Sequence, residues 1–303
     1  MNDDKIRANG RYNFKKNRNL YLLVLPFMSL FFVFTIIPVA FSMFASFTHY
    51  DILNPPAFVG FDNYRRLFVE DPLFTLTLQN TFVMAIFVGP IGFTLSFLIA
   101  WMLNELPVKL RAVLTVIFYA PSMSGQAFMM FTILFSGDPQ GWLNALLMRW
   151  GFMDTHVIWL ESTTWMMPIT IGVSIWLSMG IGFLSFVAGL QTIDKAQYEA
   201  GYVDGIKSRW QELWFITLPN MRPMLMFGAV ISITSALSVG AVGAALTGNP
   251  SPQYATHTVL LHLIDYGNVR MEMGYASAIA VIMLGLMLGA NALFQKFLRR
   301  MGT

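Results

Sequence analysis

The chain has 303 residues, of which 56% are hydrophobic and only 12% are charged, and its net charge is +3. Soluble globular domains have about 25% charged residues, so this composition predicts an all-α protein embedded in a membrane. Cysteine is absent, which excludes disulfides, thiol catalysis and cysteine-bound metals, and so small a net charge does not indicate nucleic-acid binding.

Six uncharged apolar segments follow one another along the chain, and each can cross about 30 Å of hydrocarbon as a helix. They are residues 20–47, 76–103, 112–135, 165–190, 223–246 and 275–294. The first is too long for the apolar region of a signal peptide, so we expect it to stay uncleaved. The predicted organisation is a basic N-terminus, 1–19, and a six-helix membrane domain, 20–303.

The positions of Lys and Arg predict the orientation. The N-terminus, the connection after the second span, the central loop 191–222 and the C-terminus hold fifteen of the nineteen Lys and Arg residues. Basic residues gather on the cytoplasmic side of membrane proteins. We therefore expect a multi-pass protein of the cell membrane with both termini and the central loop in the cytoplasm.

Three outer connections are predicted, 49–74, 136–164 and 247–274. Short helices are expected at 142–150 and near 256–267, and the tryptophans Trp142, Trp150, Trp159 and Trp165 suit the membrane interface. The four histidines, His49, His156, His257 and His262, all fall in these connections. Their spacing does not match a helical metal site, so we expect them on the surface and predict no metal.

Several predicted spans contain helix-breaking or small residues. Prolines within or near the spans are explained either as tolerated kinks or as unwound backbone that lines a cavity. The neighbourhood of Pro121, with Ser122, Ser124 and Gln126, is the best candidate for unwinding. Gly285 and Gly289 in the last span form a G-x-x-x-G pair that indicates close helix packing.

The central loop, 191–222, is a charged, amphipathic stretch between the fourth and fifth spans. Asp194 can cap a helix from Lys195 to about Asp204, with Gln197 as its capping-box partner, and Gly205 fits a left-handed stop. A second short helix is expected at 209–216 before Leu218 and Pro219. A helix with such a small-residue face either docks into a partner protein or rests on lipid headgroups.

The stretch YEAGYVDGIKSRWQELWFITLP resembles the EAA loop of permease subunits in binding-protein-dependent ABC importers. Seven residues stand at the family's motif positions: Glu199, Ala200, Gly201, Gly205, Ile216, Leu218 and Pro219. The pair Asp204–Gly205, the segments FVGFDNYRRLF (58–68) and MGYASAIAV (273–281), and the six-span layout are similar to the carbohydrate branch, of the maltose-transporter type. Gly201, where the family usually has Ala, and Ile206–Lys207 depart from the pattern.

The resemblance implies a transport subunit that is not an enzyme and has no catalytic residue. It implies a cytoplasmic ABC ATPase dimer, a second homologous permease in a heterodimer, an extracytoplasmic solute-binding protein and the lipid bilayer as partners. No cofactor is expected on this chain, because ATP and Mg belong to the ATPase and the chain lacks a phosphate-binding G-x-x-x-x-G-K stretch. The residues implied in ATPase coupling are Tyr198, Glu199, Ala200, Gly201, Asp204, Gly205, Ile216, Leu218 and Pro219.

The predicted spans contain no Asp, Glu, Lys, Arg or His. Ion-coupled carriers and channels usually need such groups at depth, so a secondary transporter is disfavoured and a neutral, polyhydroxylated cargo is favoured. In the family the pathway is lined by spans beside the EAA loop. The substrate-pathway candidates are Gln126, Trp176, Ser178, Gly182, Ser232, Thr234 and Ser235.

Each candidate has packing or hydrogen bonding between helices as its alternative explanation, and the partner permease is the alternative place for the binding groups. The function favoured by the sequence is the permease of an ATP-driven importer for a sugar or oligosaccharide. The alternatives are a permease for another small solute and a membrane scaffold without transport. An enzyme inside the membrane would need a polar constellation at depth, and the predicted spans lack one.

Overall fold

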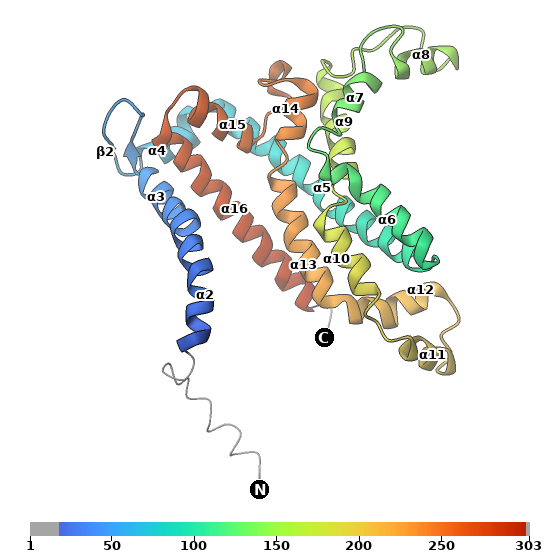
Figure 1. Cartoon of the computed structure of the whole chain (residues 1–303). Coiled ribbons are helices and arrows are strands. Elements are labelled where there is room, and N and C mark those ends of the chain that lie inside the picture. The colour runs from blue at the N-terminus through green and yellow to red at the C-terminus, as the bar shows by residue number, and fades with distance from the viewer. Residues whose placement is uncertain (1–17, 301–303) are drawn as a thin grey trace.

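The computed structural model describes residues 18–300, which form a helical molecule with one small hairpin (Figure 1). The predicted basic N-terminus 1–19 lies outside the described residues except for its last two. The chain starts with a long helix made of α2 (Arg18–Phe31), the π-turn η1 (Phe32–Ile36) and α3 (Ile37–Ala45). In its most apolar window this helix has no buried residue, and Figure 1 shows it standing beside the other helices.

A short outer segment follows α3. The antiparallel strands β1 (Thr48–His49) and β2 (Ala57–Phe58) form a hairpin, and α4 (Asp62–Arg65) and the π-turn η2 (Arg66–Glu70) lead to the next long helix. The buried amide of Asn63 donates to the carbonyl oxygens of Ser46 and Thr48, at 2.9 and 2.8 Å, and so fixes the hairpin on α4.

The second predicted span is confirmed as a single helix, α5 (Pro72–Asn104). The third is divided, because α6 (Val108–Met123) ends where Ser124 becomes extended and α7 (Met129–Leu134) starts five residues later. The break begins at Ser124, within the neighbourhood of Pro121 that the sequence indicated, and the intervening Ser and Gly residues have low helix propensity. The expected outer helix is α8 (Trp142–Arg149).

The fourth predicted span is a pair of helices, α9 (Thr163–Leu177) and α10 (Ile181–Leu190), that meet at a bend of 42°. The central loop contains α11 (Lys195–Val203), α12 (Arg209–Glu212) and the π-turn η3 (Leu213–Thr217). The fifth predicted span is α13 (Leu218–Leu237) followed after a break by α14 (Ala241–Thr247). The predicted separate helix at 209–216 is wrong, because α12, η3 and α13 form one continuous helix.

This continuity has a physical reason. Pro219 has no N–H group to close a helical hydrogen bond, and the π-turn η3 widens the helix at that place without ending it. The predicted capping box at Asp194 and Gln197 is also wrong. Asp194 caps α11 through the Ala196 N–H, but the side chain of Gln197 accepts a bond from Asn220 instead.

The last part of the chain runs through the short helix η4 (Pro252–Tyr254), α15 (Val259–Ile264) and the π-turn η5 (Asp265–Val269) to α16 (Met273–Arg300). The sixth predicted span is confirmed as this long helix. The packing predicted for Gly285 and Gly289 is not found in the described chain, since a Cβ atom at either position would have no neighbour within 4 Å.

Within residues 18–300, four helices are long and apolar enough to cross a membrane, and the bent pair α9–α10 makes up to five. The count of six crossings stays a prediction, because α6 and α7 are each too short to qualify. The start of α2, the end of α16 and the central loop lie at one end of the molecule, and the hairpin, α8 and α15 lie at the other (Figure 1).

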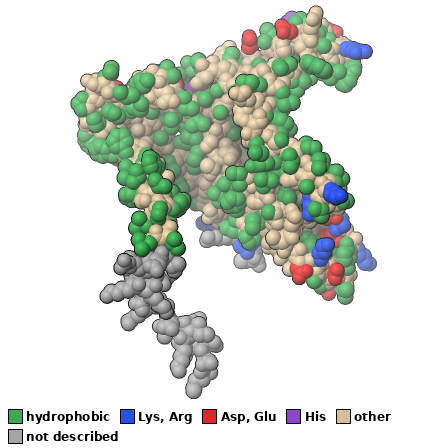
Figure 2. Space-filling view, in the orientation of Figure 1, with side chains coloured by type: hydrophobic (Ala, Val, Ile, Leu, Met, Phe, Trp, Pro, Cys, Tyr) green, Lys and Arg blue, Asp and Glu red, His purple; other side chains and the backbone are tan. Residues whose placement is uncertain are grey.

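Two clusters of buried hydrophobic side chains pack the helices together, one at each end of the molecule. One packs α5, α10 and α13 around Phe97, Phe183 and Phe186, near the central loop. The other packs α5, α15 and α16 around Phe74, Tyr275 and neighbouring side chains at the opposite end. Figure 2 shows Lys, Arg, Asp and Glu gathered over α11 and α12, and the middle of this face is largely uncharged.

Candidate functional site

The central loop places α11 as a short helix at the end of the molecule, with one side packed on η3 and α13. The Tyr198 and Thr217 hydroxyl oxygens lie 3.0 Å apart, and the amide of Asn220 donates to Gln197 at 2.6 Å. Gly201 is buried against Ile216, because a Cβ added there would lie 2.7 Å from the Ile216 Cδ1 atom. The departure from the family's Ala thus coincides with a close contact between the two helices.

The nine residues predicted for ATPase coupling fall into two groups in the structure. Glu199 and Ala200 on α11 and Asp204 at its C-cap are exposed. Gly205, which follows the C-cap, and Pro219, in the first turn of α13, are exposed as well. Tyr198, Gly201, Ile216 and Leu218 pack inward against η3 or the adjoining core. The loop therefore offers an exposed polar helix on a base of packed side chains.

Gly205 ends α11 with φ +92°, a conformation that glycine adopts without a steric penalty. The Ile206 N–H donates to the Gly201 carbonyl at 2.9 Å and satisfies a group at the helix end. The left-handed stop predicted at this residue is confirmed. The second helix then begins at a true capping box, formed by Ser208 and Gln211.

A cavity of about 440 Å³ lies among α5, α6, α9, α10 and α13. The cavity lies where three of the predicted spans are interrupted. The bend between α9 and α10 contributes Ser178 and Gly180 to its lining, and the break between α13 and α14 contributes Ser238 and Gly240. Ser122 comes from the last turn of α6. Irregular backbone at membrane depth is tolerated where it lines a cavity, so the helix breaks and the cavity belong together.

Hydroxyl groups give this cavity its polar character. The described lining contains no Asp, Glu, Lys, Arg or His, and its hydroxyl residues are Ser96, Tyr119, Ser122, Ser174, Ser178, Ser232, Ser235 and Ser238. Ser122, Ser178 and Ser232 each donate their proton to a backbone carbonyl, at 2.7, 2.6 and 2.9 Å. Their oxygens remain free to accept hydrogen bonds, which suits a ligand rich in O–H donors.

Four of the seven predicted substrate-pathway residues line the cavity: Ser178, Gly182, Ser232 and Ser235. The other three do not. The Trp176 ring packs edge-on against Phe131, with ring centroids 5.1 Å apart, and Thr234 donates to a carbonyl of its own helix. Gln126 is exposed in the link between α6 and α7.

Sequence reasoning missed Ser96, Tyr119, Ser174 and Ser238 as lining residues. Ser238 directly follows α13, and its place beside Gly240 was a usable signal of a helix break. Tyr119 and Ser174 carry no signal of their own, because their proximity depends on how α6 and α9 cross α5.

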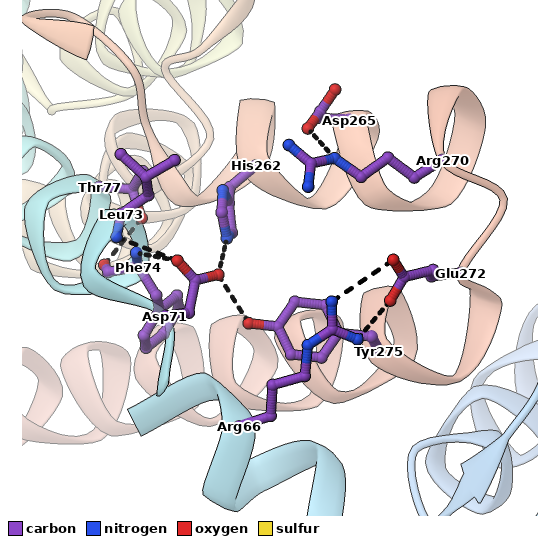
Figure 3. Close-up of polar contacts among 10 residues, drawn as sticks. All are labelled: Arg66, Asp71, Leu73, Phe74, Thr77, His262, Asp265, Arg270, Glu272 and Tyr275. Carbon is purple, nitrogen blue, oxygen red and sulfur yellow. Dashed lines mark hydrogen bonds and ion pairs between the residues drawn. The ribbon is translucent and has the colours of Figure 1, made fainter. Parts of the chain in front are cut away.

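A second polar constellation lies at the opposite end of the molecule and was also missed (Figure 3). The Asp71 carboxylate caps α5 through the N–H groups of Leu73 and Phe74. The same carboxylate accepts a bond from the Tyr275 hydroxyl at 2.7 Å and lies 2.9 Å from His262 Nε2. Because an ionised carboxylate only accepts, Nε2 carries the proton.

Charge pairing continues around this outer cluster. Arg66 forms an ion pair with Glu272, and its guanidinium lies 4.4 Å from the centre of the Tyr275 ring. Arg270 pairs with Asp265 at 2.8 Å. The two segments that resemble the carbohydrate branch, 58–68 and 273–281, therefore meet here, and Gly274 is packed so closely that a Cβ would lie 2.1 Å from the Thr48 carbonyl oxygen.

The histidines of this region correct an expectation. His257 and His262 are buried, with 3% and 1% of their surface exposed, although a surface position was predicted. Burial lowers the pKa of His257 to about 4, and it lowers the pKa of His262 despite the opposing effect of Asp71. Burial of Asp71 favours its neutral form, but Tyr275 and His262 outweigh this effect and hold its pKa below the usual value.

The His residues do not form a metal centre with their neighbours. Among residues 18–300, no group of three or more His, Cys, Asp or Glu side chains could hold a metal ion. The outer cluster is instead a set of hydrogen bonds and ion pairs that joins α5, α15 and α16.

Comparison with protein families gives a match to a model described as "Binding-protein-dependent transport system inner membrane component", which covers residues 92–303. The chain is 32% identical over 288 residues to "Probable ABC transporter permease protein YesP" of Bacillus subtilis, a match that covers 91% of each chain. It is 28% identical to "Arabinooligosaccharides transport system permease protein AraP" of Bacillus subtilis, over 89% of this chain and 85% of that protein.

The fold is also similar to solved structures. One is the crystal structure of a bacterial ABC transporter involved in the import of the acidic polysaccharide alginate, with a TM-score of 0.79 and 25% identity over 96% of this chain and 98% of the other. A second, with a TM-score of 0.78 and 25% identity over 96% of this chain and 97% of the other, holds an alginate transporter in complex with its alginate pentasaccharide-bound periplasmic protein.

Proposed function

The chain belongs to the family of binding-protein-dependent transport system inner membrane components, and from this premise we propose that it carries a sugar or oligosaccharide through the cavity at the helix breaks. As a permease subunit it has no ATPase site of its own. The observation that carries the proposal is a lining with several hydroxyl groups and, among the described residues, no charged side chain.

The chemistry of the cavity favours a neutral saccharide. Each sugar hydroxyl can donate to a serine oxygen whose own proton is already bound to the backbone, and apolar sugar faces can pack on Phe93 or Tyr119. A saccharide with carboxylates is the second candidate, because the similar solved transporter imports the acidic polysaccharide alginate. The cation needed for such a cargo would come from the partner permease.

ATP hydrolysis would drive transport through the central loop. A separate cytoplasmic ATPase dimer, which holds ATP and Mg, would grip the exposed side of α11 at Glu199, Ala200 and Asp204. Movement of α11 would pass to α13 through the Tyr198–Thr217 and Gln197–Asn220 contacts. Since α13 lines the cavity, its movement would turn the cavity from one side of the membrane to the other.

The other proposed partners are the lipid bilayer, a second permease and a solute-binding protein, and they are supported by exposed surfaces of this chain and by a similar solved structure. The apolar helix α2–α3 has no buried residue in its most apolar window, which supports contact with the bilayer and with a second, homologous permease in a heterodimer. One similar transporter was solved with a periplasmic binding protein, and a protein of this kind would dock at the outer end. The gathering of Lys and Arg at the N-terminus, in the central loop and at the C-terminus supports a cytoplasmic position for both termini.

The test compares two matched variants, Gly205→Asp and Gly151→Asp. For each, two quantities are measured: the amount of ATPase that is recovered with the chain, and the uptake of sugar. Both glycines have positive φ and no atom within 4 Å of an added Cβ, so the two substitutions impose a similar local strain. Gly205 ends α11, whereas Gly151 follows α8 at the other end.

We expect the native chain and Gly151→Asp to recover an ATPase and a second permease from detergent extracts and to support uptake. Gly205→Asp should insert into the membrane but lose the ATPase and the uptake. Equal ATPase recovery from both variants would contradict docking on α11, and uptake without any ATPase would contradict the proposed function.

A further inference from the structure

Arg209 lies between two carboxylates that belong to different parts of the molecule. Its Nη2 atom lies 2.7 Å from Glu105, at the end of α5, and its Nη1 atom donates to Glu212 at 2.8 Å within its own helical segment. The Glu212 side chain is only 5% exposed, and burying a carboxylate is costly unless a positive partner lies close to it, which here is Arg209. Arg209 is thus a bridge, and the contact to Glu105 spans two separate helices.

Glu105 connects this bridge to the wall of the cavity. It is the C-cap residue of α5, the helix that contributes Gly92, Phe93 and Ser96 to the lining. The preceding residue, Asn104, accepts a bond at 3.1 Å from Arg111 on α6. The end of α5 and the start of α6 are therefore joined beside the point where Arg209 binds.

An aromatic contact supports the same junction. The rings of Trp101 and Trp210 are tilted against each other with centroids 5.7 Å apart, directly beside the ion pair. Trp101 lies one helical turn before Glu105 on α5, and Trp210 follows Arg209 on α12. The two helices thus share one packed and one charged contact, and such a pair resists sliding as well as separation.

The bridge also reaches the docking helix. Tyr202 on α11 hydrogen-bonds to Glu212, which raises the pKa of the tyrosine. The contacts of α11 described above, at Tyr198 and Gln197, lead to α13. The contacts that lead from the loop to α5 and α6 pass through α12, by way of Arg209 and Trp210.

From these contacts we infer that Arg209 is a positioning residue that makes the α5–α6 wall of the cavity move together with the ATPase-docked α11. The inference rests on the proposed function and names a regulatory link within it. Without the link, α13 would follow α11 but the opposite wall would not. The cavity would then fail to close on one side, and ATP would be hydrolysed without transport.

The charges explain why arginine is required. Its planar guanidinium can point one amino group at each carboxylate, whereas a lysine ammonium is a single point charge. If Arg209 is neutralised, Glu105 and Glu212 are left with like charges across the junction. The expected result is separation of α12 from the end of α5, with α11 still held on α13.

The experiment uses the complete transporter, reconstituted with its ATPase, second permease and binding protein. The variants are Arg209→Gln, Glu105→Gln and their combination, and the control is Arg65→Gln, which removes an exposed Arg–Glu pair at the outer end. We expect ATPase recovery and binding-protein-stimulated hydrolysis to be retained in every variant. Uptake per ATP should fall about tenfold in both single variants and no further in the double variant, because one contact is lost in each.

A distance measurement separates this role from a merely structural one. The chain has no cysteine, so spin labels can be placed at Lys195→Cys on α11 and Val108→Cys on α6 without further changes. With Arg209 present, the distance between the labels should stay the same when ATP is added. With Arg209→Gln it should change or broaden on addition of ATP.

Three outcomes would overturn the inference. Normal uptake per ATP in both single variants would show that the contact transmits nothing. Loss of ATPase recovery in Arg209→Gln would show that Arg209 only shapes the docking loop. Identical label distances with and without Arg209 would exclude coupled movement. A native complex that recovers no ATPase would overturn the proposed function as well, so the two failures are distinguishable.

Discussion

The Asp71 carboxylate and the His262 imidazole lie 2.9 Å apart, although 191 positions separate them in the chain. Their contact joins the beginning of α5 to α15, and the bond from Tyr275 adds α16 to the same carboxylate. One aspartate therefore caps a long helix and fastens two others to it.

Replacing Asp71 should destabilise the outer end strongly. Asp71→Ala removes a helix cap, the acceptor for Tyr275 and the partner of His262, so we expect a loss of about 3 kcal/mol in unfolding free energy. Thermal unfolding of the purified chain in detergent measures it. Asp154→Ala, at an exposed aspartate, is the control and should change little. Equal unfolding temperatures for the two variants would contradict the role given to Asp71.

Acid should weaken the same region. The pKa of His257 falls from 6.5 to about 4 on folding, so the unfolded chain binds a proton more tightly between these values. Stability should therefore decrease as pH falls from 6.5 to 4, by about 3 kcal/mol from this residue, and His262 acts in the same direction. Unfolding free energy measured against pH tests this. His257→Gln should show a shallower slope, and an unchanged slope would refute the assignment.

Gly228 should not tolerate any side chain. A Cβ atom on it would lie 2.4 Å from the Phe186 ring, which is 1% exposed and packs among α5, α10 and α13. The Phe186 ring also packs edge-on against Phe93 and Phe97 on α5, which restricts its movement, so Gly228→Ala should cost about 2 kcal/mol of stability despite the better helix propensity of alanine. Gly285→Ala is the control, since nothing lies near its Cβ position. Comparison of unfolding midpoints would show the difference, and a stabilised Gly228→Ala chain would contradict this packing.

Asn144 holds the outer connection between α7 and α9. Its buried amide donates to the carbonyl oxygens of Ser136, Asp138 and Val157, and its oxygen accepts from Val157 and from the Trp159 indole. Asn144→Ala should leave these groups unpaired and make the loop 136–159 accessible. Limited proteolysis should then cut this loop at least about tenfold faster than in the native chain, because local opening costs less free energy. An unchanged cleavage rate would show that the loop does not depend on Asn144.

The sequence by itself determined the elements of this protein. Long uncharged apolar segments are helical for a local reason, since each satisfies its own backbone hydrogen bonds, and α5 and α16 appear where predicted. The stop at Gly205 and the break after Pro121 are also local, because each depends on the backbone freedom or the hydrogen-bonding capacity of a few residues. The family resemblance of the central loop is likewise carried by contiguous residues.

Only the tertiary structure decided which side chains meet. His257 and His262 were expected on the surface, but both are buried: His262 lies against Asp71 at the start of α5, and His257 packs on the rings of Tyr254 and His262. No local pattern records that packing. Trp176 and Thr234 stand on the predicted helices yet turn away from the cavity, whereas Ser238 and Tyr119 enter it. The reason is physical: the angle at which helices cross and the place at which they break depend on contacts between distant residues, such as Asp71 with His262 and Arg209 with Glu105.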